Sequence, residues 1–335
     1  MRRLLVIAGT AMLLALSATT SAAPSEPRAA RTASSGHLFV AVFANNQQEV
    51  LRFPFINGVP AQTPDLTFAN LTAPMTVGHD GTFYATVPLG CCQGLGQIEV
   101  FPPNSTQPAR QITLPNLNQD TTIDTALVEA RGGYLYVGYA AFISGVRGGV
   151  SQHVPLQGVA VYPPRFNGGG APARMFDVPL DLAGPLALAL DRAGDLYVST
   201  TSNNDNHNRV YTVSNPSSDP HVTGALEFPA SMNAYGLAIS DDERSLYVLA
   251  LGAQPELAVY PFGASGHAQP SRTIDLSPRL TVLPGLDIVG AIAYVCVYIH
   301  PAEVLGYDKH ASGSPPPSYT LGLQAETATG MAIGP

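Results

Sequence analysis

The sequence is poor in charge, lysine and cysteine, and it has no long apolar run beyond its first two dozen residues. Charged residues make up 12% of the 335-residue chain, Lys309 is the only lysine, and the formal net charge is −8. A nucleic-acid partner needs a basic stripe for its phosphates, so this composition argues against one. An acidic surface is likewise unsuited to anionic membranes.

The N-terminus has the layout of a secretory signal peptide. Two arginines precede an apolar run over residues 4–16, and small residues follow it. We expect a signal peptide over residues 1–22, a flexible leader over residues 23–35 and one folded domain over residues 36–335. The apolar run is too short for a spanning helix, and no later stretch reaches about 18 apolar residues. The sequence therefore predicts a secreted or periplasmic protein without a membrane span.

Three cysteines, Cys91, Cys92 and Cys296, leave at least one thiol unpaired within a single chain. None of them lies at the cleavage site, so no lipid anchor is expected. Cys296 lies within the strand-like segment AIAYVCVYI and is expected to be a buried small hydrophobic residue. A Cys91–Cys92 disulfide would be strained, and the redox state of this pair is left open.

Glycine, proline and short apolar segments are abundant instead. The chain contains 32 Gly and 30 Pro, yet 45% of its residues are hydrophobic, which is too high a share for a disordered chain. The apolar residues come in short β-branched and aromatic bursts between turns. This combination excludes a helical bundle and predicts many short strands joined by tight turns.

One pattern recurs along the chain with a period of about 45 to 50 residues. A short apolar segment is followed by a turn, an aromatic strand, a polar loop, a second aromatic strand and a last short strand. The clearest copy covers residues 234–276, with AYGLAIS, RSLYVLAL, ELAVYPF and SRTIDL as its segments. Four short strands per unit are typical of a β-propeller blade, which buries both apolar faces by packing between two neighbours.

Aromatic residues mark the second and third strands of every unit. The expected second-strand aromatics are Phe39, Tyr84, Tyr136, Tyr197, Tyr247 and Tyr294. The expected third-strand aromatics are Phe53, Phe101, Tyr162, Tyr211, Tyr260 and Tyr307. An insertion over residues 139–157 lengthens the third unit, and it is either a source of specificity on one face or a neutral change in length.

The two ends of the chain determine the number of blades. Residues 36–43 match a second strand, and the missing first strand is found in TGMAIGP over residues 329–335. We therefore predict an all-β fold, a six-bladed β-propeller of four-stranded antiparallel blades, closed by the C-terminal strand joining the N-terminal blade. The predicted blades are 329–335 with 36–68, then 73–115, 124–179, 184–229, 234–276 and 282–323.

The segments GPLALALDRAGDLYV (residues 184–198) and AYGLAISDDERSLYV (residues 234–248) resemble NHL-type repeats and those of the gluconolactonase and senescence-marker six-bladed propellers. The stretch VYPFGASGHAQPSRTI (residues 259–274) resembles the repeat of secreted bacterial NHL-like propellers. The resemblance covers nearly the whole chain after the leader and implies the fold. Gluconolactonase-type members hold a divalent metal at the axis, and NHL-like lyases use axial histidines. Neither set of residues can be matched residue by residue in this sequence, so neither activity is carried over from the resemblance.

Ligands of propellers usually lie at the mouth of the central channel, among the loops that enter first strands or join second and third strands. Polar residues expected in such loops are Asp124, Asn203, Asp205, His207, Asn233, Tyr235, His300 and Glu303. The densest cluster, SNNDNHNR over residues 202–209, suits a cation or a sugar but lacks the features of an EF-hand loop. A solvated turn is the competing interpretation, because Asn and Asp tolerate left-handed backbone.

Two functions of different class follow from this pattern. The sequence contains no G-x-S-x-G elbow, no HExxH motif and no phosphate-binding glycine loop. We therefore expect an exported, monomeric binding or scaffold module for a carbohydrate, peptide or cell-envelope component, with no catalytic residue and no cofactor. The alternative is a metal-dependent lactonase or lyase-like enzyme, with calcium or zinc near the axis and ligands drawn from Asp124, Asp205, His207, His300 and Glu303.

Overall fold

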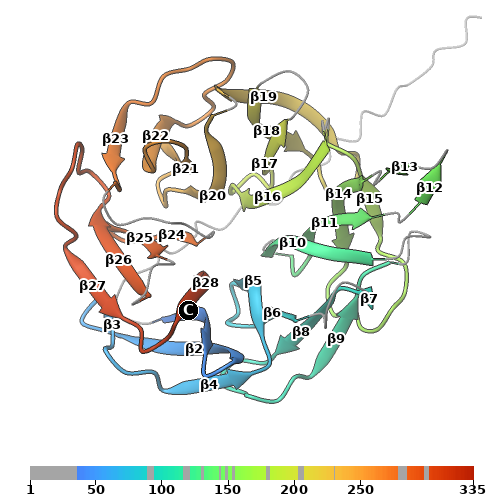
Figure 1. The fold of residues 1–335 in the computed structure, drawn as a ribbon, viewed down its shortest axis with the longest axis horizontal. Helices are drawn as coiled ribbons and strands as arrows, with labels where there is room; N and C mark the ends of the chain where they lie inside the picture. The colour runs from blue at the N-terminus through green and yellow to red at the C-terminus, as the bar shows by residue number, and fades with distance from the viewer. Residues whose placement is uncertain are drawn as a thin grey trace, which may run out of the picture.

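The computed structural model describes residues 36–88, 94–115, 121–129, 132–142, 145–147, 150–152, 155–178, 182–202, 207–229, 231–277, 285–297 and 302–335. Within these residues the strands form six antiparallel blades arranged in a ring around one axis (Figure 1). The predicted six-bladed β-propeller is confirmed. No helix in the described part of the chain is long and apolar enough to cross a membrane.

Each blade is built from four strands, which follow one another from the axis outward. Blade 1 contains β28 (Thr327–Gly334), β1 (His37–Ala44), β2 (Gln47–Ile56) and β4 (Leu66–Ala69). Blade 2 contains β5 (Thr72–Val77), β6 (Phe83–Val87), β8 (Gln97–Phe101) and β9 (Arg110–Thr113). Blade 3 contains β10 (Thr121–Glu129), β11 (Leu135–Phe142), β14 (Pro155–Tyr162) and β15 (Arg174–Phe176).

The other three blades follow the same order. Blade 4 contains β16 (Leu182–Leu190), β17 (Leu196–Ser202), β18 (His207–Ser214) and β19 (His221–Pro229). Blade 5 contains β20 (Asn233–Ile239), β21 (Ser245–Leu251), β22 (Glu256–Pro261) and β23 (Arg272–Asp275). Blade 6 contains β24 (Leu286–Val289), β25 (Ile292–Val297), β26 (Glu303–Asp308) and β27 (Tyr319–Gly322). Two short strands extend blades 1 and 3: β3 (Val59–Pro60) and β7 (Gly94–Leu95).

The ring closes by pairing the two ends of the described chain. β28 pairs antiparallel with β1, from His37 opposite Gly334 to Phe43 opposite Thr327. In Figure 1 the red strand β28 accordingly lies at the axis beside the blue strands of blade 1. The predicted join between the terminal strands is therefore confirmed.

The core is divided among the six junctions between neighbouring blades. Six clusters of buried residues are found, and each combines side chains from two adjacent blades. Successive residues of one strand alternate between junctions: Phe39 packs against blade 2, whereas Leu38 and Val40 pack against blade 6. Successive side chains of a strand point to opposite faces of the sheet, and both faces are buried here. The sequence of each strand is therefore an almost continuous apolar run.

In three blades, a glycine in the loop between the third and fourth strands makes backbone hydrogen bonds to the preceding blade. The amide of Gly266 donates to the carbonyl of Ala225 at 2.7 Å, and its carbonyl accepts from the amide of Glu227 at 2.8 Å. Gly168 and Gly313 make the corresponding pairs of bonds with blades 2 and 5. We call these three glycines the clasp glycines. All have positive φ (89°, 61° and 71° in chain order), and each lies six residues after the third-strand aromatic.

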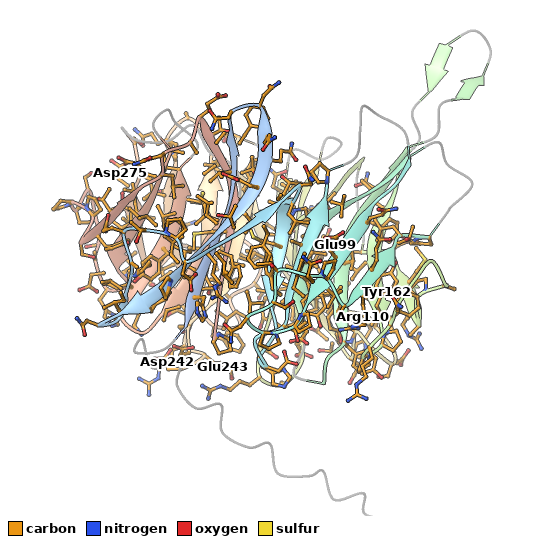
Figure 2. All side chains as sticks on the ribbon, turned by 90° about the horizontal axis from the view of Figure 1, so that it is seen from below. Glu99, Arg110, Tyr162, Asp242, Glu243 and Asp275 are labelled. Atoms are coloured by element: carbon orange, nitrogen blue, oxygen red, sulfur yellow. The ribbon has the colours of Figure 1, made fainter. Side chains whose placement is uncertain are left out.

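Blade 3 extends beyond its neighbours at one face of the ring. β11 and β14 remain paired out to Phe142 opposite Pro155, and the residues between them form a separate two-stranded hairpin, β12 (Gly145–Arg147) with β13 (Val150–Gln152). Figure 2 shows this hairpin projecting from the face opposite Asp242 and Glu243. We call these two sides the hairpin face and the turn face. The insertion predicted at residues 139–157 thus lengthens two strands and adds a projecting element.

Candidate functional site

The six innermost strands surround an axial channel of about 490 Å³. Its walls come from β5, β10, β16, β20, β24 and β28, as expected for the first strand of each unit. Most lining side chains are aliphatic, which suits strands that converge at an axis and pack against both neighbours. Tyr235, one of the predicted ligand-binding residues, lines this channel.

Five of the predicted site residues lie within strands or at their ends rather than in loops. Asp124 pairs with Tyr139 inside β10, and His207, Asn233 and Glu303 are the first residues of β18, β20 and β26. The prediction of loops was wrong for these residues and for Tyr235, because the ladders continue further toward the hairpin face than the sequence pattern indicates. Asn203, Asp205, His300 and the Cys91–Cys92 pair lie outside the described residues.

Asn233 takes part in a contact between blades 4 and 5. The side chain of Asn208 is almost fully buried, at 1% exposure. Its amide nitrogen donates to the Oδ1 of Asn233 at 2.9 Å and to the carbonyl of Met232 at 2.6 Å. Because a buried amide left without these partners would be costly, the pair has a structural role. Among the described residues, no three His, Cys, Asp or Glu side chains gather closely enough to hold a metal ion.

Glu129, at the turn-face end of β10, is a channel residue that sequence reasoning missed. On each of the other five innermost strands, one residue holds the equivalent position in the pairing with the second strand. We call such a set of equivalent positions a rung. The five residues at the rung of Glu129 are all aliphatic: Val77, Leu190, Ile239, Ile288 and Ile333. The Glu129 side chain is 3% exposed. A single carboxylate therefore interrupts an otherwise apolar ring. The acidic residue is visible in the segment TALVEA. Its alignment with five aliphatic residues is apparent only from the register of the six innermost strands.

Blade 2 supplies the partners of the Glu129 carboxylate. Its Oε2 accepts from the backbone amide of His79 at 3.1 Å, and its Oε1 accepts from the Tyr84 hydroxyl at 3.2 Å. Burial raises the pKa of Glu129, against the lowering effect of the His79 amide, and burial followed by the Glu129 charge raises the pKa of Tyr84. A Cβ at Gly78 would lie 2.3 Å from Oε2, so a larger residue there would require the Glu129 carboxylate to move.

Asp287 is a second acidic residue of the channel wall, on the blade opposite Glu129. Its Oδ2 accepts from the amide of Ile333 in β28 at 3.0 Å, and its Oδ1 accepts from the amide of Ile288 at 2.8 Å. At this rung the other innermost strands carry Thr76, Val128, Ala189, Ala238 and Ala332. Asp287 thus ties blade 6 to the strand that closes the ring.

Two histidines, His79 and His267, are exposed, with side-chain exposures of 56% and 71%. The sequence expectation of a buried Cys296 is confirmed. Cys296 is buried at 1% exposure, and burial raises the pKa of its thiol to about 12. Such a thiol has little thiolate at neutral pH and is inert as a nucleophile.

These blades, their closure and their axial channel define a six-bladed β-propeller. Comparison with solved structures agrees: a putative 6-phosphogluconolactonase from Bacteroides uniformis matches with a TM-score of 0.51 and 10% identity, over 87% of this chain and 84% of that one. A protein of unknown function from Bacteroides caccae matches with a TM-score of 0.49 and 10% identity, over 90% and 99% of the two chains.

The β-propeller domain of Cps50 (Swd1) from Myceliophteria thermophila matches with a TM-score of 0.44 and 13% identity, over 79% of this chain and 94% of that one. No protein-family model matches the chain, and no curated protein matches it. At 10% identity, the likeness to the Bacteroides uniformis structure supports the fold and leaves the function to the site.

Proposed function

We propose that the protein is an exported binding module whose hairpin face recognises an extracellular or cell-envelope component, a carbohydrate or a peptide. The observation that carries the proposal is the β12–β13 hairpin of blade 3, which projects from this face (Figure 2). The corresponding connections of blades 1 and 5, residues 45–46 and 252–255, are short turns. Binding segments are commonly loops held on a rigid scaffold, and a propeller supplies such a scaffold.

The physics of the hairpin supports a role in binding. A two-stranded hairpin alone is marginally stable in water, so it contributes little to the stability of the ring. Among the described strands, β12 and β13 pair only with each other. Their outer edges therefore offer backbone donors and acceptors to an extended peptide or to the hydroxyls of a glycan.

The test removes the hairpin without disturbing blade 3. Residues 143–154 are replaced by Asn-Gly, which closes a two-residue turn between the paired residues Phe142 and Pro155. Wild type and variant are incubated with insoluble peptidoglycan, chitin and cellulose and with immobilised extended peptides, and the retained fraction is measured. We expect retention on one of these probes and at least a tenfold weaker affinity for the variant. Equal retention of both proteins, or retention of neither, would contradict the proposal.

The second candidate function is a metal-dependent lactonase or lyase-like enzyme. Its support is the likeness in fold to the Bacteroides uniformis protein described as a putative 6-phosphogluconolactonase. It ranks second because no three His, Cys, Asp or Glu side chains of the described residues gather closely enough to hold a metal ion. Hydrolysis of a sugar lactone that is lost with a chelator and restored by calcium or zinc would place this candidate first.

A further inference from the structure

A second cavity lies on the turn face between blades 1 and 2. Its volume is about 280 Å³, and it shares no lining residue with the axial channel. Three phenylalanines and three prolines supply the apolar part of its wall. Six polar side chains also line it: His37, Arg52, His79, Asp80, Asn104 and Ser105. We call this cavity the inter-blade pocket.

Arg52 is the central polar group of the inter-blade pocket and is 7% exposed. Its Nε and Nη2 donate to the two carboxylate oxygens of Asp65 at 2.9 and 2.7 Å, and its Nη1 donates to the Oδ1 of Asn104 at 2.9 Å. A guanidinium carries five N–H donors. The donors left over after these three bonds have no hydrogen-bond partner among the described residues, although buried polar groups are normally satisfied.

The other polar side chains supply both donors and acceptors. Asn104 accepts from Arg52 through its oxygen, which leaves its amide N–H groups as donors. Asp80 accepts the amide of Thr82 at 2.8 Å, and its carboxylate has further acceptor sites. Burial and the Arg52 charge lower the pKa of His37, so the imidazole is neutral at pH 7 and keeps an acceptor nitrogen.

This combination distinguishes between classes of ligand. A carboxylate or phosphate accepts hydrogen bonds only, and in this pocket it would meet the negative charge of Asp80, while the Arg52 charge is already paired with Asp65. A hydroxyl group both donates and accepts, so it can satisfy the unused Arg52 donors and the Asp80 acceptor together. The apolar wall then packs against the C–H groups of the ligand. The volume of about 280 Å³ lies just below the range of about 300–1,000 Å³ that is usual for drug-sized ligands, so the pocket suits a smaller one.

We propose that the inter-blade pocket binds a neutral polyhydroxy ligand the size of one monosaccharide, through Arg52, Asp80 and Asn104. The Arg52–Asp65 pair holds the guanidinium in place before the ligand arrives, and the Glu129 carboxylate fixes the turn that carries His79 and Asp80. The pocket lies on the opposite face from the hairpin, so this proposal is independent of the proposed function.

The test measures binding of single sugars to the whole protein. D-glucose, D-galactose, D-mannose, N-acetyl-D-glucosamine and myo-inositol are titrated by saturation-transfer NMR into wild type and two pocket variants. Asn104→Gly removes the amide and keeps the left-handed backbone, since Asn104 has a φ of 59°. Asp80→Asn removes the charge and keeps the bond from Thr82. We expect at least one probe to bind wild type and to bind each variant at least tenfold more weakly.

The matched control is Asp242→Asn. Asp242 holds the equivalent turn of blade 5, accepting the amide of Arg244 at 3.2 Å, and it does not line the inter-blade pocket. This variant should bind the single sugars as wild type does, and the hairpin deletion should keep the part of that binding that the pocket variants lose. The proposal is overturned if no probe binds, if both pocket variants bind like wild type, or if inorganic phosphate or acetate binds and the neutral sugars do not.

Discussion

Substitution of a clasp glycine, Gly266→Ala, should destabilise the junction between blades 4 and 5. Gly266 has a φ of 61°, and a Cβ built on it meets no atom within 4 Å. The substitution therefore introduces no steric clash, and its effect comes from the backbone alone. Alanine must adopt the left-handed conformation to keep the two hydrogen bonds to blade 4.

The expected fall in the free energy of unfolding has a lower and an upper value. Left-handed backbone costs an L-residue about 1–2 kcal/mol, and the stiffer unfolded chain returns about 0.4–1 kcal/mol, so the free energy of unfolding falls by about 1 kcal/mol if both bonds survive. If the loop instead leaves the left-handed conformation and loses both bonds, the two bonds cost about 1 kcal/mol each in place of the backbone cost, and the free energy of unfolding falls by about 1 to 2 kcal/mol. Asparagine adopts this conformation more readily than alanine, so Gly266→Asn should lose less stability.

Urea unfolding of the three proteins tests the reasoning, because a shift of the midpoint at constant slope reports stability. Gly194→Ala is the control. Gly194 has a φ of 92° and open space around its Cβ. It lies in the turn between β16 and β17, and among the described residues its backbone bonds only to Asp191 of the same turn. The alanine variant at Gly266 should lose at least as much stability as this control. If Gly266→Ala is as stable as wild type, or if Asn destabilises as much as Ala, the account of the clasp is wrong.

Three further predictions concern the channel, the thiol and the closure. Because burial raises the pKa of Glu129 beside His79 and Asp80, its contribution to stability is full at low pH and is lost as the pH rises through the folded pKa. Glu129→Gln should therefore be more stable than wild type at pH 7 and equal to it near pH 4, in urea titrations at both pH values; lower stability at pH 7 would contradict this. Iodoacetamide at pH 8 should leave Cys296 unmodified in the native protein and modify it after unfolding, as read by mass spectrometry. Deletion of residues 327–335 should abolish the cooperative thermal transition followed by circular dichroism, and an intact transition would refute the role of β28 in closure.

Much of the fold could be predicted because one local pattern is repeated six times. The aromatic residues named from sequence lie in the second and third strands of their blades, from Phe39 in β1 to Tyr307 in β26. The split unit at the two ends also determined the closure, since β28 supplies the strand that blade 1 lacks. Strand ends were less predictable, as Asp124 shows, because the extent of a ladder depends on its partner strands.

The sites depend on relations that a linear pattern does not contain. Glu129 becomes unusual only when six strands are aligned by rung, and the sequence alone shows one acidic residue at the end of an apolar segment. The inter-blade pocket joins His37, Arg52, Asp80 and Asn104 from two blades, and these residues follow no motif. The clasp glycines could have been found, since each lies six residues beyond a third-strand aromatic, but the spacing gains meaning only once the neighbouring strand is in place.

The closure by β28 also governs the order in which the protein can be completed during synthesis. β1 is among the first described strands to be made, yet the strand that covers its inner edge is made last. Until residues 327–334 emerge, blade 1 exposes the backbone groups of β1 to any strand nearby, including another nascent copy. A chain that ends early keeps this edge permanently and should aggregate or be degraded. Closure of blade 1 therefore waits until β28 has been synthesised.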